Sequence, residues 1–220
     1  SAVFNSSFAV NQGEVLAIVG ESGSGKSVTA LSLLGLINPK KVLYKSTNSI
    51  LFEGRELTSL SENEWQDIRG NEIGMVFQEP MSSLNPLMKV GEQVAEVIRV
   101  HKRVSEKKAR ARARYLLRLV GIDHADERME AYPFELSGGQ RQRVMIAMAV
   151  ANHPKVLIAD EPTTALDVTV QKRIIELLRR LKEEKNLSYL FICHNLALVQ
   201  EFCDRVLVMK DGQIVEEGTP

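Results

Sequence analysis

The sequence has few residues of several kinds, and each scarcity argues against a class of protein. Only Cys193 and Cys203 are cysteines among 220 residues, and their spacing fits neither a disulfide framework nor a zinc site. Basic and acidic residues number 28 each, so the overall charge favours neither nucleic acid nor an anionic membrane as a partner. No hydrophobic run approaches the roughly 20 residues that a membrane-spanning helix requires. We therefore expect a globular protein with reduced thiols.

The chain shows instead a regular alternation of strand-like and helix-like segments, which predicts an α/β fold. Hydrophobic residues make up 44% of the chain, enough for a sizeable core at this length. The apolar runs at 14–20 and 155–160 predict buried strands, and Asp211 with Gly212 predicts a hairpin turn. We expect further strands at 49–54, 73–78, 188–194, 206–210 and 213–218, and helices at 27–37, 90–101, 105–122, 168–186 and 195–202.

Residues 20–27 read GESGSGKS and match the pattern G-x-x-x-x-G-K-[ST] without a mismatch. Its glycines let the backbone curl until successive N–H groups face one concave site, between a strand and a helix. Lys26 is expected on the β- and γ-phosphates of a nucleotide and the Ser27 hydroxyl on Mg²⁺. A chance glycine turn is the alternative. The predicted nucleotide-binding residues here are Gly20, Glu21, Ser22, Gly23, Ser24, Gly25, Lys26, Ser27 and Val28.

The segment KVLIADE, residues 155–161, predicts the second half of this site. Asp160 follows a buried parallel strand, at the edge where open α/β sheets bind ligands, and is expected to hold Mg²⁺. Glu161 is the next residue, so its side chain points elsewhere and can act on the attacking water as a general base. Two exposed carboxylates without a catalytic role are the alternative.

A second phosphate-binding element is the segment LSGGQ at residues 136–140, before an apolar helix expected to start at residue 137. The N-terminus of such a helix attracts anions. Because residues 20–27 already form one cradle, we predict that two chains pair head to tail and that each LSGGQ binds the nucleotide of the other. Ser137 would donate its hydroxyl, and Gly138 and Gly139 their N–H groups, to the γ-phosphate, and Gln140 completes this predicted site.

The order of GESGSGKS, VFQEP, LSGGQ, VLIADEP, TALD and a lone histidine resembles the nucleotide-binding domain of ABC (ATP-binding cassette) proteins, over nearly the whole chain. The resemblance implies an ATPase with ATP and Mg²⁺ as cofactors. It implies that Gln78 binds Mg²⁺ and senses the attacking water, that Asp167 lies at the dimer seam, and that His194 contacts the γ-phosphate. The alternatives are a strand-end amide for Gln78 and helix caps for Asp167 and His194.

The resemblance also implies one ABC ATPase domain over residues 1–220. Its α/β core would be that of a P-loop NTPase with a mainly parallel sheet, formed by residues 1–89 and 132–220 with a small antiparallel β subdomain. An α-helical subdomain at 90–131 would be inserted, since this block has only helical patterning. The basic run at 110–120 would be the solvated face of an amphipathic helix. We expect packing for Trp65, a mobile loop at 40–48, and surface or loop positions for His101, His124 and His153.

Residues 20–37, 69–98 and 136–171 closely resemble the ATPase subunits of bacterial peptide and nickel importers. This implies import of peptides or peptide-like substrates and a peripheral position on the cytoplasmic face of the bacterial inner membrane. The implied partners are a second cassette, which could be identical, different or fused in tandem, transmembrane permease subunits docked near QEPMSSLNP, and indirectly a periplasmic binding protein. Nucleic acid is not among them.

Some family features have no counterpart in the sequence. Because the sequence opens at SAVFNSSFAVNQGEV, we expect the family's first strand and the aromatic residue that stacks on adenine to be absent. Phe4 and Phe8 come too late to match that aromatic residue and are expected to pack in the small sheet. Cys193 and Asn195 flank His194, where Thr and Asp are commoner in the family. A non-transport ABC ATPase acting on ribosomes or nucleic acid is the alternative function. A regulatory cassette without catalysis is a third, although the site motifs are intact.

Overall fold

The computed structural model describes residues 3, 6–38 and 48–220, and its main sheet has six strands in these ranges. The strand order is β4-β5-β6-β1-β7-β8, and every neighbouring pair is parallel except β7 and β8. The predicted P-loop-type α/β fold with a mainly parallel sheet is therefore confirmed. The strands are β1 Val15–Val19, β4 Ile73–Val76, β5 Val156–Asp160, β6 Ser188–Ile192, β7 Arg205–Lys210 and β8 Gln213–Gly218.

Strand β1 lies at the centre of the sheet and is buried on both faces. Val15, Ala17 and Val19 belong to one hydrophobic cluster, while Leu16 and Ile18 belong to the other. Alternate residues of a strand point to opposite faces, so the apolar run at residues 15–19 is what a strand covered on both sides requires.

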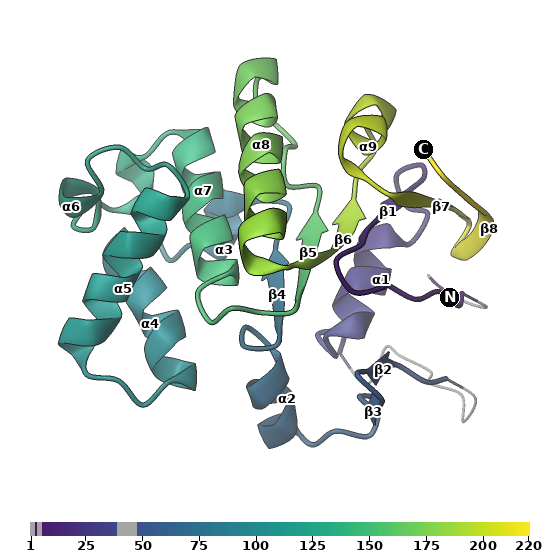
Figure 1. Ribbon diagram of the computed structural model, residues 1–220, viewed down its shortest axis with the longest axis horizontal. Helices are drawn as coiled ribbons and strands as arrows, with labels where there is room; N and C mark the ends of the chain where they lie inside the picture. Colours follow the sequence, from purple (N-terminus) through teal and green to yellow (C-terminus); the bar gives the residue numbers. More distant parts are fainter. Residues whose placement is uncertain (1–2, 4–5, 39–47) are drawn as a thin grey trace.

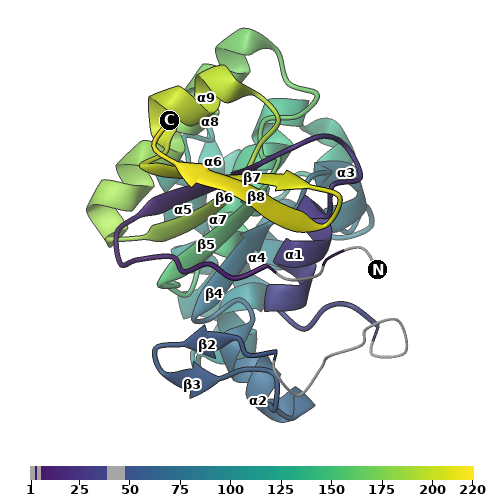
Figure 2. The ribbon, with the colours of Figure 1, turned by 90° about the vertical axis from the view of Figure 1, so that its right-hand side faces the viewer.

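Helices cover both faces of this sheet (Figures 1 and 2). The first cluster includes residues of α4, α5, α7, α8 and α9, whereas the second includes residues of α1 and α2. In the described residues the helices are α1 Lys26–Leu33, α2 Glu62–Ile68, α3 Pro80–Ser83, α4 Val90–His101, α5 Glu106–Leu119, α6 Ala125–Arg128, α7 Gly138–Ala149, α8 Val168–Lys185 and α9 Leu196–Phe202, with a 3₁₀ turn at Pro133–Glu135.

The block at 90–131 contains α4, α5 and α6, which lie together on the left of Figure 1. Ser105 caps α5 by accepting the N–H of Lys108, the position at which the sequence has no acidic capping partner. The apolar side of α5 is buried through Ala109, Ala113 and Leu116, so the charged run faces outward as the helical spacing predicts. The division into a core and an inserted subdomain stays a prediction.

A small antiparallel sheet consists of β2 Leu51–Phe52 and β3 Arg55–Glu56. The turn between them has positive φ at Glu53 and Gly54, so the strand predicted at 49–54 ends early in a hairpin. Phe8 packs against the second cluster, as does Phe52 of this small sheet. Phe4 and residues 40–47 of the predicted loop lie outside the described residues. Trp65 is buried below the Arg69 guanidinium, which confirms its packing role.

The sheet order explains where functional residues can gather. Strands β4, β5, β6 and β1 are parallel, so the segments that follow them leave the sheet at one edge. Figure 1 shows the arrowheads of β5 and β6 pointing to the top, beside the loop that leads into α1. Four stretches far apart in the sequence meet at this edge.

Candidate functional site

The glycine loop between β1 and α1 has the backbone freedom that its sequence implies. Gly20, Gly23 and Gly25 have φ of 153°, 82° and 104°, which are values that side-chain-bearing residues rarely adopt. A Cβ at Gly20 would also collide with the backbone carbonyl of Met209. The Ser24 hydroxyl is buried and has no hydrogen-bond partner in the described part of the chain. A curled loop with an unsatisfied hydroxyl fits an oxyanion ligand such as phosphate.

Lys26 begins α1 and folds back over this loop. Its Nζ donates to the carbonyls of Gly20 at 2.9 Å and Glu21 at 2.8 Å, and the side chain is buried. A buried ammonium ion needs hydrogen-bond acceptors, and these two carbonyls supply them. The positive charge is thereby held at the mouth of the loop, where it would complement a phosphate.

The second half of the site adjoins the first through Ser27 and Asp160. The Ser27 hydroxyl donates to Asp160 Oδ1 at 3.1 Å. Burial raises the pKa of the Asp160 carboxyl, and the hydrogen bond from Ser27 opposes this shift. A nearby cation would stabilise the ionised form of such a carboxylate.

This hydroxyl and carboxylate fit Mg²⁺, which prefers oxygen ligands and binds through few side chains together with water and phosphate oxygens. The described residues contain no cluster of three His, Cys, Asp or Glu side chains, so a site for a metal held by many side chains is absent there. Gln78, a predicted metal ligand, hydrogen-bonds to Glu161 in this structure rather than to Ser27 or Asp160.

Glu161 has a strained backbone and a well-anchored carboxylate. Its φ is 47°, an uncommon value for a residue with a side chain, and its N–H donates to the Ile192 carbonyl. Its Oε2 lies 3.2 Å from Gln78 Nε2 and 3.2 Å from His194 Nδ1, and accepts the Thr164 hydroxyl at 2.8 Å. The structure therefore brings together the predicted residues 78, 161 and 194. Sequence reasoning did not single out Thr164.

The LSGGQ segment lies elsewhere in the chain. Ser137 is the N-cap of α7, and its Oγ accepts the Gln140 N–H while Gln140 Oε1 accepts the Ser137 N–H. The Ser137 hydroxyl is thus an acceptor inside the helix end, and its own proton stays available for a ligand. In the described ranges no hydrogen bond joins residues 137–140 to the glycine loop. Figure 1 shows α7 and α1 on opposite sides of β5 and β6.

Asp167 lies close to this segment. Its carboxylate accepts the Val170 N–H at 2.9 Å and caps α8. In this structure Asp167 thus has the helix-capping role given above as the alternative. A Cβ on Gly139 would come within 2.7 Å of Val170 Cγ1, and one on Gly138 within 3.6 Å of Leu166. The glycines of α7 therefore allow close approach to the start of α8. The helix cap considered as the alternative role of His194 is not observed, because Asn195 caps α9.

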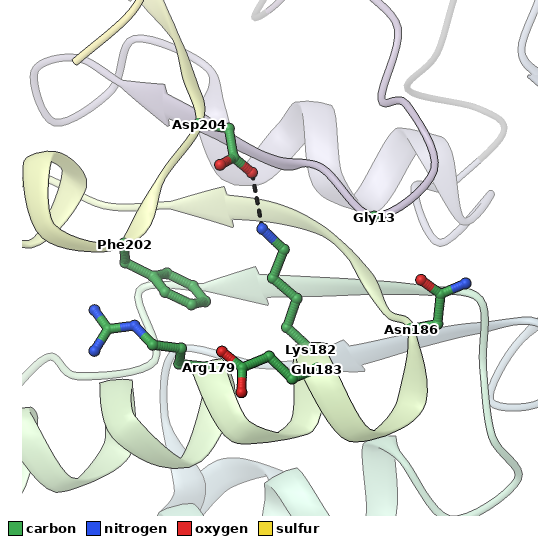
Figure 3. Close-up of a pocket in the computed structure, with 7 residues that line it drawn as sticks. All are labelled: Gly13, Arg179, Lys182, Glu183, Asn186, Phe202 and Asp204. Atoms are coloured by element: carbon green, nitrogen blue, oxygen red, sulfur yellow. Dashed lines mark hydrogen bonds and ion pairs between the residues drawn. The ribbon is translucent and has the colours of Figure 1, made fainter.

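The size of the hollows does not identify this site. A hollow of about 90 Å³ is lined by Glu161, Thr164, Cys193 and His194, among others. A larger hollow of about 390 Å³ lies beside the C-terminal ends of α8 and α9 (Figure 3). In this larger hollow Lys182 donates to Asp204 at 2.9 Å, so these two opposite charges neutralise each other. The smaller hollow is lined by Glu161, which has the strained backbone, and by two of the polar side chains that contact it, Thr164 and His194. We therefore take this hollow as part of the functional site.

The remaining predictions concern the cysteines and the other histidines. Cys193, which lines the smaller hollow, and Cys203 are both free thiols. His101 ends α4, His124 precedes α6 and His153 lies in a turn beside Arg112; burial lowers the pKa of His101 and His153. Within the described ranges, no helix combines the length and apolar character needed to cross a bilayer.

Sequence comparisons agree with the geometry. The family model for the ABC transporter matches residues 3–164. The oligopeptide transport ATP-binding protein OppD of Bacillus subtilis is 54% identical over 218 residues, covering 99% of this chain and 61% of that protein. The peptidoglycan transport ATP-binding protein YejF of Agrobacterium fabrum is 55% identical over 218 residues, covering 99% of this chain and 40% of that protein. This chain thus spans about two fifths to three fifths of their lengths.

A solved structure also matches over nearly the full chain. It is the ATP-binding cassette MJ0796, as a dimer in a post-hydrolysis state bound to ADP and Pi, with a TM-score of 0.87 and 31% identity. The match covers 99% of this chain and 90% of that one. A family model that spans most of the chain, relatives above 50% identity and a shared fold lead to one conclusion: this chain belongs to the ABC transporter family.

Proposed function

We propose that the chain binds ATP with Mg²⁺ and hydrolyses it. The observation that carries this proposal is the convergence of Gln78, Thr164 and His194 on Glu161, next to the pair formed by Ser27 and Asp160. Residues 20–28 would bind the phosphates, with Lys26 turning from the loop carbonyls to the β- and γ-phosphates. Ser27 and Asp160 would hold Mg²⁺, with Gln78 approaching it after nucleotide binds. The ion would neutralise charge that develops on the phosphates.

Glu161 would be the general base of this reaction. Its carboxylate takes the proton from the water that attacks the γ-phosphorus, while the bond to the leaving ADP oxygen breaks. His194 is largely exposed beside Glu161, with 60% of its side chain accessible, so its ring can reach a γ-phosphate. Thus Glu161, His194 and Gln78 form the proposed catalytic group.

We propose further that two cassettes pair head to tail. The loop at 20–28 is a phosphate cradle in its own right, and α7, which begins in the segment at 137–140, lies across β5 and β6 from α1, so one nucleotide would bridge the two segments from two different chains. Ser137, Gly138, Gly139 and Gln140 would bind the γ-phosphate of the partner, and Asp167 would lie at the seam. The dimeric MJ0796 cassette supports pairing in this family. Hydrolysis would remove the bridge and let the dimer open.

The names of similar proteins support a transport role. OppD and the dipeptide transport protein DppD of Escherichia coli, at 54% and 50% identity, suggest that this chain powers import of peptides or peptide-like compounds. Its partners would then be permease subunits and, through them, a periplasmic binding protein, with the chain peripheral on the cytoplasmic face of the inner membrane. Residues 90–131 would form the subdomain next to the permease. With equal numbers of basic and acidic residues, nothing favours the ribosomal or nucleic-acid alternative.

The mass of the Glu161→Gln chain in solution, measured by light scattering with and without MgATP, tests this proposal. We expect an ATP-dependent dimer, because the variant binds ATP but lacks the base that removes the bridging γ-phosphate. Wild-type chain should hydrolyse ATP, and the variant should be slower by on the order of 10²-fold. Normal turnover by the variant would refute the assignment of Glu161. A monomer that still binds ATP would refute self-pairing and point to a different partner cassette.

A further inference from the structure

One hydroxyl that converges on Glu161 has been given no catalytic or binding role in the function proposed above. Thr164 lies three residues after Glu161, and its Oγ1 donates to Glu161 Oε2 at 2.8 Å. This is the shortest of the three polar contacts to that oxygen, since Gln78 and His194 both lie at 3.2 Å. A hydrogen bond to an ionised acceptor is stronger than one between neutral groups.

The backbone holds this hydroxyl in place. The N–H of Thr164 donates to the Glu161 carbonyl at 3.1 Å, so residues 161–164 form a turn. Positive φ values at Glu161 and Ala165, 47° and 61°, bend the chain at both ends of the turn. Gln171 from α8 fixes its middle by donating to the Thr163 carbonyl at 3.1 Å. The hydroxyl is therefore built into a rigid segment, and it stays beside the carboxylate.

The other two contacts come from groups with proposed duties elsewhere. Gln78 and His194 would turn toward Mg²⁺, water and phosphate when nucleotide binds, and both contacts to Glu161 would lengthen. The Thr164 contact does not depend on those movements. No described residue hydrogen-bonds to Glu161 Oε1, so this second oxygen is left to accept a proton.

We infer that Thr164 is a positioning residue for the base: its hydroxyl holds Glu161 Oε2, which directs Oε1 toward the attacking water. This inference rests on the proposed ATPase function. Without the hydroxyl the carboxylate would rotate among several conformers, and only some of them would receive the proton. The effect should appear in turnover, because the hydrogen bonds of Thr164 in the described residues go to Glu161 and not to the glycine loop that would bind ATP.

The test compares Thr164→Val and Thr164→Ser in the full chain, assembled with its partner cassette. Valine has nearly the same shape without the hydroxyl, and should lower kcat about 10-fold, or about 1.4 kcal/mol, with little change in KM for ATP or in melting temperature. Serine should restore kcat to within about threefold. The matched control is Thr58→Val, which removes a 2.7 Å hydroxyl contact to Glu56 in the small sheet and should leave turnover unchanged.

A double variant separates this inference from the function on which it rests. If Thr164 acts through Glu161, adding Thr164→Val to Glu161→Gln should not lower the single-turnover rate further. A wild-type kcat in Thr164→Val, or the same fold loss in both backgrounds, would overturn the inference. Normal turnover in Glu161→Gln alone would instead overturn the proposed function.

Discussion

The hydroxyl of Ser27 donates to a carboxylate oxygen of Asp160 at 3.1 Å, across 133 positions of sequence. Ser27 lies in the first turn of α1, and Asp160 ends β5. Strand β6 lies between β5 and β1, so two strand ends separated by one neighbour deliver these groups to the same edge. The proposed magnesium site therefore depends on the sheet order and on neither segment alone.

Removing the Ser27 hydroxyl should weaken nucleotide binding only when Mg²⁺ is present. We expect Ser27→Ala to raise the Kd of MgATP about 10-fold, or about 1.4 kcal/mol, because one oxygen ligand is lost. Titration calorimetry with Mg²⁺ and with a chelator measures both values. Ser32→Ala is the matched control, since that hydroxyl bonds to the Val28 carbonyl within the same helix. Equal losses with and without Mg²⁺ would contradict the assignment.

Removing the Lys26 ammonium should weaken binding under both conditions. A hydrogen bond to a charged group contributes about 1.5–3 kcal/mol, so Lys26→Ala should raise the Kd for ATP by on the order of 10- to 100-fold. The phosphates carry their charge with or without Mg²⁺, which is why the ion does not matter here. The same calorimetry tests this, with the exposed Lys107→Ala on α5 as the control. An unchanged Kd would remove Lys26 from the phosphate site.

The Ser137 cap offers a separate test of head-to-tail pairing. Both Ser137 and Ser105 cap a helix by accepting an N–H three residues later, so changing either to alanine should cost about 1 kcal/mol of stability. Only Ser137→Ala should also reduce ATP-dependent dimerisation, because only that hydroxyl would face a partner's nucleotide. Light scattering in the Glu161→Gln background measures pairing, and thermal melting measures the cap. Equal pairing in both variants would argue against the assigned role.

Gly139 of the LSGGQ segment has a packing role that can be tested on the monomer. A Cβ at Gly139 would approach Val170 Cγ1 to 2.7 Å, so Gly139→Ala should force α7 and α8 apart. Overpacking of this kind costs about 1–3 kcal/mol. Adding Val170→Ala should recover most of that loss, as urea denaturation of the single and double variants would reveal. If the double variant shows only the sum of the two losses, the contact is not the cause.

The nucleotide loop, the strand alternation and two helices were predictable because each depends on local pattern. The helix predicted at 90–101 has these bounds in the structure, whereas the one predicted at 105–122 is shorter, at Glu106–Leu119. Helix α2 escaped prediction, although Ser61 and Glu64 form the capping box that S-x-x-E would have signalled. The contact of Thr164 with Glu161 had no such signal. This contact depends on a positive φ at Glu161. Glutamate rarely adopts this conformation, so the sequence gives no reason to expect it there.

The contact of Gly139 with Val170 was unpredictable for a different reason. It arises only when α7 packs against α8, because the absence of a Cβ on Gly139 then leaves room for the Val170 side chain. Sequence reasoning identified Gly139 as a candidate phosphate-binding residue from its motif. Packing in the folded chain adds a second constraint on the same position, and the two constraints need different experiments.

Stability should depend on pH through the Glu14 and Arg205 pair. Arg205 Nε donates to Glu14 Oε1 at 2.7 Å, Nη2 reaches Oε2 at 3.2 Å, and the guanidinium also contacts the Ala9 carbonyl and Glu217. The hydrogen bond from Arg205 lowers the pKa of Glu14 below its usual 4.5. A carboxyl with a lowered pKa in the folded state stabilises the protein above its unfolded pKa, and loses this contribution as pH falls through the folded value.

Glu14→Gln should therefore lower the free energy of unfolding by about 1.5–3 kcal/mol at neutral pH, the range for a hydrogen bond to a charged group. The difference from wild type should shrink as pH falls below 4.5, because the wild-type carboxyl then becomes protonated as well. Urea denaturation at about pH 7 and about pH 3 measures it. Glu96→Gln, an exposed change on α4, is the control. A difference that is the same at both pH values would mean that Glu14 stabilises through packing, without a contribution from its charge.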